Sequence, residues 1–231
     1  MPSRRSGSMP VRRPDRLVLV AGTATDVGKT WVAATVAREL RRLGTAVAAR
    51  KPVQSFDPGP EPTDAEVLGE ATGEDPEQVC PSHRWYPLAM APPMAAAALG
   101  RPPFSIGDLT DELRWPRAVE VGLVEGVGGP RSPLASDGDT VDVARVLGPD
   151  LILLVADAGL GTINATRLSA GAFGTARVLV VLNRFDGADG LHRANRSWLR
   201  DRCGLVVTLV EDLAPRLRER IGAANRPAGP D

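Results

Sequence analysis

The sequence predicts an α/β protein whose mostly parallel β-sheet is covered by helices on both faces. Three observations lead to this class. Apolar runs alternate with helical patterns along most of the 231 residues. Residues 151–156 are entirely apolar, which is typical of a central strand in a parallel sheet. A glycine-containing loop lies between the apolar run at residues 17–21 and a helical pattern at Val32, Val36 and Leu40, which predicts the order strand, loop, helix.

The same patterns place the other elements. Gly44 is expected to cap the first helix, and Thr63 to cap a helix that begins at Asp64. Further strands are expected at residues 45–50, 118–124, 177–182 and 205–210. Further helices are expected at residues 95–99, 106–113, 141–147, 191–202 and 213–221, and loops at residues 56–63 and 131–139. Together these elements predict one domain over residues 17–222, between a disordered basic extension (1–16) and a flexible tail (223–231).

Composition and charge exclude several classes of function. The first 16 residues carry five arginines against one aspartate, so the remaining body has a net charge of −4 and lacks a basic field for nucleic acid. No run of 18 apolar residues could span a membrane, and no apolar signal segment is present. Cys80 and Cys203 have no metal-site spacing and fit a reducing compartment. We therefore expect a cytoplasmic protein that binds neither nucleic acid nor membrane; a start at Met9 and an acidic partner for the arginines stay open.

The loop after the first strand has the composition of a phosphate-binding loop. Residues 22–30 read Gly-Thr-Ala-Thr-Asp-Val-Gly-Lys-Thr, with five residues between the glycines where the common pattern has four. A helix N-terminus favours phosphate through its free N–H groups and its dipole, and Gly28 lets the backbone approach closely. Lys29 can reach the terminal phosphates, and the Thr30 hydroxyl can bind Mg²⁺. The Gly-rich turn at residues 159–164 also opens a helix, which makes it a second candidate anion site.

Three other charged residues stand near the predicted strand ends. Lys51 follows the strand at residues 45–50, and a lysine there faces the usual ligand crevice of an α/β protein; a solvated surface lysine is the alternative. Asp64 lies in the first turn of its helix, where it is either a ligand or a partner of the helix dipole. Glu125 ends a strand and precedes the glycine-rich residues 126–129, which suits a Mg²⁺ ligand with backbone close to phosphate.

Taken in order, these motifs resemble the dethiobiotin synthase family over most of residues 17–210. The five-residue spacing of the phosphate loop is also that family's form. The family belongs to the P-loop NTPases, in the group that includes nitrogenase iron protein and partition ATPases, so the resemblance implies that fold. The matching motifs are the loop at residues 22–30, Lys-Pro-Val-Gln-Ser at 51–55, Thr-Asp-Ala at 63–65, Val-Glu-Gly-Val-Gly-Gly at 124–129 and Gly-Thr-Ile-Asn at 161–164.

The resemblance implies a cyclo-ligase of biotin biosynthesis that forms carbon–nitrogen bonds at the expense of ATP. The substrates would be 7,8-diaminononanoate, carbon dioxide and ATP, with Mg²⁺ as cofactor. One amine becomes a carbamate, whose oxygen attacks the γ-phosphate of ATP. The neighbouring amine then attacks the mixed anhydride and closes the ring of dethiobiotin, leaving ADP and phosphate. The family is dimeric, so a homodimer is expected.

The resemblance also assigns residue roles. Lys29 would neutralise charge on the transferring phosphoryl group, and Lys51 would stabilise the carbamate; Ser55 would contact the carbamate or the substrate. Thr30, Asp64 and Glu125 would hold Mg²⁺. The turn with Gly161, Thr162 and Asn164 would present a helix N-terminus to the substrate carboxylate across the dimer interface. The nucleotide would contact Asp26, Val27, Gly28, Lys29, Thr30, Trp31, Asp64, Glu125, Gly126, Val127, Gly128 and, through its base, Asn183.

The sequence departs from the family pattern at four positions, which are Phe56, Ala165, Thr208 and Glu211. Residues 183–186, Asn-Arg-Phe-Asp, are also similar to the guanine-binding signature of GTPases, so the base could be that of ATP, CTP or GTP. Other possibilities are a cobyrinate-amidating-like, metabolite-sensing or partition-type relative without this activity. A partition ATPase would need a second early lysine in the phosphate loop and a basic DNA-binding face, and an amidating relative would need a glutaminase.

Overall fold

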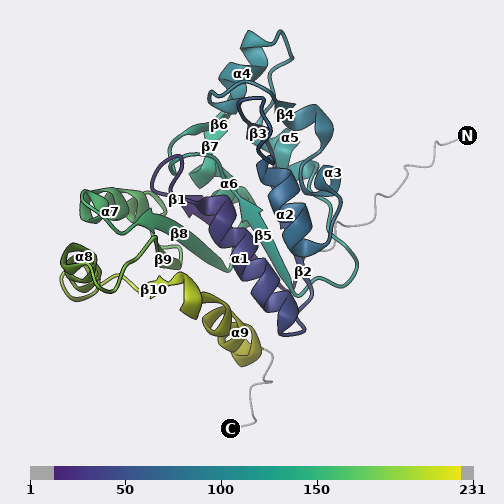
Figure 1. Ribbon diagram of the computed structural model, residues 1–231. Helices are drawn as coiled ribbons and strands as arrows, with labels where there is room; N and C mark the ends of the chain where they lie inside the picture. The colour runs from purple at the N-terminus through teal and green to yellow at the C-terminus, as the bar shows by residue number, and fades with distance from the viewer. Residues whose placement is uncertain (1–12, 225–231) are drawn as a thin grey trace, which may run out of the picture.

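The computed structural model describes residues 13–224, and in this range a six-stranded parallel sheet forms the centre of the molecule (Figure 1). The strand order is β10-β9-β8-β1-β5-β2, and every neighbouring pair is parallel. The predicted fold class is therefore confirmed. The six strands are β1 (Arg16–Gly22), β2 (Val47–Arg50), β5 (Val121–Glu125), β8 (Leu151–Asp157), β9 (Val178–Asn183) and β10 (Val207–Leu209).

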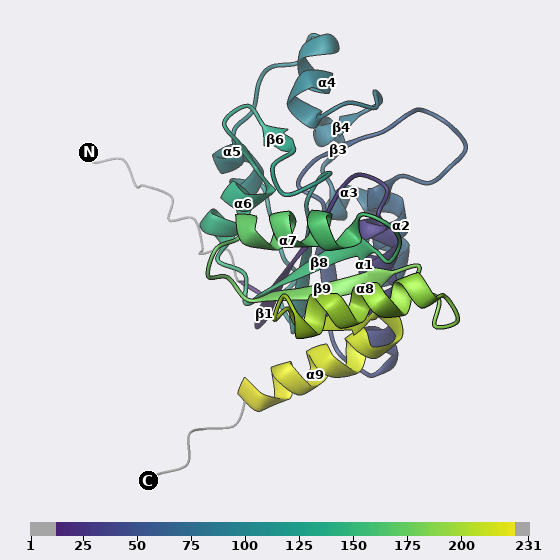
Figure 2. The same ribbon diagram turned by 90° about the vertical axis from the view of Figure 1, so that its left-hand side faces the viewer.

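Helices cover both faces of this sheet because its strands are apolar on both sides (Figures 1 and 2). Side chains alternate between the faces along β1, where Val18 and Val20 belong to one buried cluster and Leu17 and Leu19 to the other. The first cluster is completed by α1 (Lys29–Arg42), α2 (Asp64–Thr72) and α9 (Leu213–Ala224). The second is completed by α5 (Ile106–Asp111), α6 (Thr140–Leu147), α7 (Thr162–Ala172) and α8 (Gly190–Asp201).

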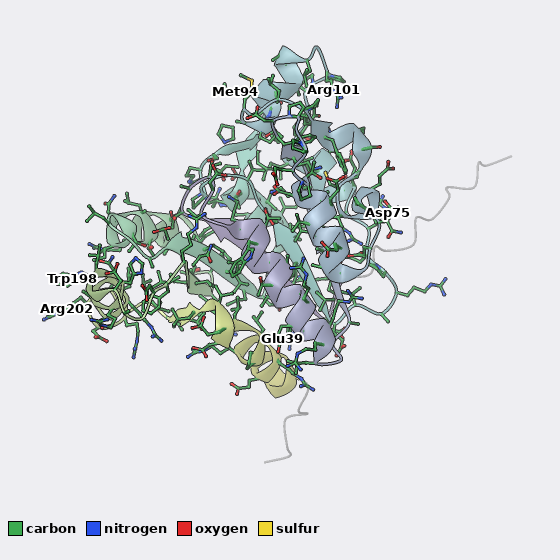
Figure 3. The ribbon with its side chains drawn as sticks, in the orientation of Figure 1. Glu39, Asp75, Met94, Arg101, Trp198 and Arg202 are labelled. Atoms are coloured by element: carbon green, nitrogen blue, oxygen red, sulfur yellow. The ribbon has the colours of Figure 1, made fainter. Side chains whose placement is uncertain are left out.

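A long excursion between β2 and β5 forms a smaller lobe at the top of Figure 1. Its outer end is marked in Figure 3 by Met94 and Arg101. Arg101 holds the lobe together, because its guanidinium lies 5.0 Å from the Tyr86 ring centre and donates a 2.8 Å hydrogen bond to the Trp85 carbonyl oxygen. The lobe contains the parallel pair β3 (Gln54–Ser55) and β4 (Trp85–Tyr86), the helices α3 (Pro76–Val79) and α4 (Pro92–Ala98), and a 3-10 turn, η1 (Ser82–Arg84).

Helix starts follow two different designs. Thr63 caps α2 in a capping box, in which the Thr63 N–H donates to Glu66 at 2.7 Å and the Thr63 hydroxyl accepts from the Glu66 N–H. By contrast, α1 and α7 begin at Gly28 and Gly161, whose φ angles are 91° and 90°, and neither has a side-chain cap. The first N–H groups of α1 are therefore left for another acceptor, whereas at α7 the Thr162 N–H donates to the Gly159 carbonyl oxygen at 3.3 Å and leaves the N–H groups that follow it.

The structure corrects several predicted boundaries. The strands expected at 45–50, 118–124 and 205–210 begin later, at Val47, Val121 and Val207. The stretch at 131–139, expected as a loop, contains an antiparallel hairpin of β6 (Pro133–Ala135) and β7 (Gly138–Asp139). These hairpin strands, like β3, β4 and α3, were not predicted from the sequence.

The chain ends also differ from expectation. Residues 13–16, expected in the disordered extension, belong to the fold: Arg13 donates to the Gly148 carbonyl oxygen at 2.7 Å, and Arg16 begins β1. At the other end α9 continues to Ala224, and a short 3-10 turn, η2 (Val210–Asp212), precedes it. The rest of the expected extension and tail lies outside the described residues. No helix within residues 13–224 is long and apolar enough to cross a bilayer.

Candidate active site

A cavity of about 790 Å³ opens beside the carboxyl ends of β1, β2 and β5. Parallel strands place the residues that follow them at one edge of the sheet, and this brings distant segments together here. The lobe between β2 and β5 forms one wall of the cavity. Most of the predicted site residues line it, namely Asp26, Gly28, Lys29, Thr30, Trp31, Lys51, Ser55, Asp64, Glu125, Val127 and Gly128.

The phosphate loop is shaped for close backbone approach. Gly28 has a left-handed backbone, and a Cβ there would lie 2.2 Å from the side-chain nitrogen of Asn183. No other residue type fits this position without displacing Asn183. The uncapped N–H groups at the start of α1 line the same edge of the cavity, which suits an anionic ligand.

Lys29 lies back along the loop. Its Nζ donates a 3.2 Å hydrogen bond to the Ala24 carbonyl oxygen, and the side chain is mostly buried. Burial and the nearby charge of Lys51 lower the pKa of Lys29 from its usual value. Two lysines so close together are favourable only where anions neutralise them.

Lys51 is the centre of a buried charge network. Its Nζ lies 2.6 Å from both Asp64 Oδ2 and Glu125 Oε1 and donates to the Gly126 carbonyl oxygen at 3.2 Å. The residue is only 2% exposed, which excludes the solvated surface lysine that the sequence left open. Burial acts to lower the pKa of Lys51, but the two carboxylates outweigh it and the pKa rises. Lys51 is therefore a fixed positive charge.

The same carboxylates meet the hydroxyl of Thr30, which donates to Asp64 Oδ1 at 2.7 Å or to Glu125 Oε1 at 2.8 Å. Burial raises the pKa of Glu125 even though Lys51 opposes the shift. Burial also acts to raise the pKa of Asp64, but attraction to Lys51 outweighs it and lowers that pKa. Glu125 Oε2 is buried and has no hydrogen-bond partner among the described residues. One hydroxyl and two carboxylates, with an orphaned oxygen, are a donor set that fits Mg²⁺.

Two predicted ligands are held by other contacts. The Ser55 hydroxyl lines the cavity and donates to the Met90 carbonyl oxygen at 2.6 Å. Asn183 is buried, and its Nδ2 donates to the Val27 carbonyl oxygen at 2.9 Å, so it supports the phosphate loop from behind. Recognition of a base by Asn183 stays a prediction.

The turn with Gly161, Thr162 and Asn164 lies outside this cavity. Thr162 is buried and its hydroxyl donates to the Asp157 carbonyl oxygen, whereas Asn164 is exposed. A Cβ on Gly161 would have no neighbour within 4 Å. Within this chain the turn therefore lies apart from Lys29 and Lys51, and its predicted role depends on a second subunit.

Sequence reasoning assigned no role to several residues that line the cavity, and three of them have polar side chains with notable positions. Gln54 accepts a 2.9 Å hydrogen bond from the Ala65 N–H, and it lies inside the motif that carries Lys51. Ser132 accepts from the Gly129 N–H at 3.0 Å, and it stands in a stretch that reads as polar loop. Arg184 follows Asn183 and is the third.

Of the four departures from the family pattern, Phe56 lines the cavity and the other three do not. Phe56 lines the cavity and packs edge-on against Trp85, with ring centres 6.3 Å apart. Thr208 is fully buried in β10, Glu211 is exposed in η2, and Ala165 is half-buried in α7.

The parallel sheet, the glycine loop and the paired lysines define a phosphate-loop protein that binds a nucleoside triphosphate. Its residues 16–211 match a family described as an AAA domain. Three curated relatives carry the name ATP-dependent dethiobiotin synthetase BioD. The protein from Anaeromyxobacter dehalogenans is 41% identical over 175 residues, covering 73% of this chain and 77% of the relative. The Aquifex aeolicus protein is 33% identical over 194 residues (81% and 85%), and the Haloferax mediterranei protein 35% over 209 (84% and 83%).

This chain belongs to the ATP-dependent dethiobiotin synthetase family. Among solved structures, the signal recognition particle receptor FtsY from Elizabethkingia anophelis aligns with a TM-score of 0.49 and 14% identity, covering 86% of this chain and 59% of that chain. That likeness is too weak to bear on function.

Proposed function

We propose that this chain forms dethiobiotin from 7,8-diaminononanoate, carbon dioxide and ATP, and releases ADP and phosphate. Its relation to the curated synthetases supports the ATP-dependent synthesis of dethiobiotin. The observation that carries the proposal is the buried Lys51, held between Asp64 and Glu125 beside the phosphate loop. A protein that only binds a triphosphate has no need of this second buried lysine, whereas one that brings another anion to the γ-phosphate does.

The phosphate loop and Lys29 would hold the triphosphate. The uncapped N–H groups at the start of α1 would bind the β- and γ-phosphates, and the Lys29 ammonium would offset their charge. Thr30, Asp64 and Glu125 would bind Mg²⁺, which supplies charge neutralisation across the phosphates during transfer. The cavity also contains the Phe56 ring and the Met90 side chain, apolar groups that suit an alkyl chain such as that of diaminononanoate.

The role of Lys51 follows from the charges around it. Lys29 and Lys51 together balance Asp64 and Glu125, so the four groups are close to neutral. If the carboxylates are shared with Mg²⁺, both ammonium groups become available to anions. The carbamate forms when an amine nitrogen attacks the carbon of CO₂ and loses a proton. Lys51 would hold the carbamate oxygen beside the γ-phosphate, where the two anions otherwise repel each other.

Two substitution steps complete the reaction. The carbamate oxygen attacks the γ-phosphorus and the bond to ADP breaks. The second amine then attacks the carbamate carbon and loses a proton, the carbon–oxygen bond breaks, and phosphate leaves with its electron pair. Lys29 and Lys51 would face the oxygens on which negative charge develops in both steps, and this is where preorganised positive charge is most effective.

The homodimer is part of the proposal. Leu160, which precedes Gly161, is 93% exposed, and Leu168 on α7 is 70% exposed. Apolar side chains so exposed around an uncapped helix start support a surface that a second subunit covers. In that arrangement the N–H groups at the start of α7 would bind the substrate carboxylate of the neighbouring active site.

The test is a product assay with each substrate omitted in turn. Purified protein with diaminononanoate, bicarbonate, Mg²⁺ and ATP should release phosphate and form dethiobiotin in equal amounts, as measured by coupled phosphate detection and mass spectrometry. Omission of diaminononanoate should stop both. CTP and GTP in place of ATP measure the base preference. Phosphate release that does not depend on diaminononanoate, without dethiobiotin, would reject the proposal in favour of an ATPase without ligase activity.

A further inference from the structure

Two residues in the described part of the chain have a left-handed backbone although they are not glycines. They are Asp26 in the phosphate loop, with φ of 58°, and Arg184 after β9, with φ of 54°. This conformation is unfavourable for any residue with a Cβ, so the surrounding contacts must hold it. The two residues are 158 positions apart in the sequence and touch each other, because Arg184 Nη2 donates a 2.9 Å hydrogen bond to the Asp26 carbonyl oxygen.

A second bond runs beside the first. Asn183, next to Arg184, donates from Nδ2 to the Val27 carbonyl oxygen at 2.9 Å. The other side of the Arg184 guanidinium lies 3.3 Å from Asp157 Oδ2, which fixes its direction. The turn after β9 therefore holds two successive carbonyl groups of the phosphate loop, those of Asp26 and Val27.

The direction of these carbonyls decides where the loop's N–H groups point. A peptide unit is planar and trans, so its N–H points opposite to its C=O. The N–H of Val27 belongs to the same unit as the Asp26 carbonyl, and the N–H of Gly28 to the same unit as the Val27 carbonyl. Because both carbonyls face the β9 turn, both N–H groups point away from that turn, and Gly28 lines the cavity.

We propose that Arg184 is a positioning residue, which holds the phosphate loop in its triphosphate-binding form before the nucleotide arrives. It acts through the backbone of Asp26, whose carbonyl oxygen accepts its hydrogen bond. The inference rests on the proposed function only in that a triphosphate occupies the cavity. The Arg184 side chain is 60% exposed, so its removal leaves the buried core of the protein intact.

The test is a double-mutant cycle at positions 26 and 184, read by calorimetric titration with Mg²⁺ and a non-hydrolysable ATP analogue. Loss of a hydrogen bond from a charged donor at a partly exposed site predicts that Arg184→Ala binds the analogue about 3- to 10-fold more weakly. Glycine adopts positive φ without steric cost, so in the Asp26→Gly background the same change should weaken binding by no more than about 2-fold. A loss that depends on the residue at position 26 is the mark of a loop-positioning role.

Two further measurements separate positioning from a general structural effect. In steady-state assays Arg184→Ala should raise the KM for ATP more than it lowers kcat, and Arg184→Lys should recover part of the loss. The Gly28 amide resonance of the ligand-free protein should move in Arg184→Ala. The matched control is Arg145→Ala, because Arg145 is 64% exposed and paired with Asp142 at 2.6 Å on α6. It should behave as the parent.

The outcomes are distinct. Parental affinity in Arg184→Ala would overturn the proposal. An equal loss in the parental and Asp26→Gly backgrounds would also overturn it, because it would indicate a direct contact between Arg184 and the nucleotide. A parent protein that binds the analogue but makes no dethiobiotin would reject the proposed function and leave this inference standing. A parent that does not bind the analogue would reject both.

Discussion

The molecule contains two turns of nearly the same backbone design with different surroundings. Both follow strands of the main sheet and open a helix at a glycine, Gly28 for α1 and Gly161 for α7. Their φ angles are 91° and 90°, and neither helix has a side-chain cap. Each therefore presents free N–H groups and the positive end of a helix dipole. By local criteria the two turns are equivalent anion sites.

Their tertiary environments differ in every respect that matters for binding. Behind Gly28 lies the Asn183 side chain, 2.2 Å from where a Cβ would be, and in front of it lie two lysines and two carboxylates. Around Gly161 a Cβ would meet nothing within 4 Å, and Leu160 is exposed. The comparison shows that two helix starts of the same local geometry differ in the charged groups that the rest of the fold places beside them. If the open turn binds the substrate carboxylate as we propose, a second subunit must complete it.

The largest expected effect concerns the charge that the first turn has and the second lacks. Lys51→Gln should retain ATP affinity within a few-fold, because Lys29, the loop N–H groups and Mg²⁺ bind the triphosphate. Loss of one preorganised charge costs about 3–4 kcal/mol, or roughly 100- to 1,000-fold in rate. Titration with a non-hydrolysable ATP analogue beside a product assay measures both quantities.

Lys29→Gln is the matched control for this prediction, since it should damage binding and turnover together. The melting temperature of both variants should be measured as well, because Lys51 neutralises the buried Glu125 and the partly exposed Asp64. A Lys51→Gln protein that forms dethiobiotin at the parental rate would show that the carbamate role is wrong.

The next prediction compares the two glycines directly. Gly28→Ala must adopt an unfavourable φ and also displace Asn183, which together cost about 2–4 kcal/mol in the phosphate-ready state. Gly161→Ala meets only the φ cost of about 1–2 kcal/mol. Titration with the ATP analogue should therefore show a loss of at least tenfold for Gly28→Ala and parental affinity for Gly161→Ala. Equal losses of nucleotide affinity in both variants would show that the surroundings do not distinguish the turns.

A smaller effect is expected at the open turn. If a second subunit covers Leu160, Leu160→Asp loses the burial of one leucine per subunit, about 2 kcal/mol each, and should raise the dimer dissociation constant at least tenfold. Sedimentation velocity over a concentration series measures this constant. Trp198→Ala is the control, because Trp198 is also exposed but lies on α8 (Figure 3). An active parental monomer at assay concentrations would contradict the dimer.

The smallest effect concerns the two cysteines: Cys80 lies in the buried cluster on the α1 side of the sheet, and Cys203 packs against the edge of the other cluster. Burial raises the pKa of the Cys80 thiol to about 12, whereas Cys203 is half-buried after α8. At pH 8 a thiol reagent such as Ellman's should therefore modify Cys203 and leave Cys80 unmodified until the protein unfolds. Cys203→Ser should abolish the native reaction. If both cysteines of the native protein reacted at the same rate, the buried cluster that contains Cys80 would have to become accessible to solvent often.

The long elements could be predicted because their apolar residues follow a recognisable pattern along the sequence. The apolar run that became β8 and the helical spacing of α1 are each long enough to show it. Strands β3, β4, β6 and β7 have two or three residues, too few for any period to show. They exist because a distant partner pairs with them, as Trp85 does with Gln54. Short sequence windows do not contain that information.

The charged site residues were predictable for a topological reason. Lys51 and Glu125 directly follow or end strands, and Asp64 opens a helix, so a parallel sheet gathers them at one edge. The support behind the phosphate loop was not predictable. The bonds from Asn183 and Arg184 depend on left-handed backbone at residues 26 and 184, and neither aspartate nor arginine signals that conformation.

The position of β1 also has a consequence for synthesis on the ribosome. This strand, which leads into the phosphate loop, pairs only with β5 and β8. At ordinary translation rates the chain between Gly22 and Val121 takes about 5–20 s to emerge. For that time β1 has been synthesised but has no neighbouring strand to pair with. During this time α1 can pack against β1, β2 and α2, but the strand edges of β1 have no partner in the main sheet. The first part of the active site to be translated therefore depends for its burial on a strand translated much later.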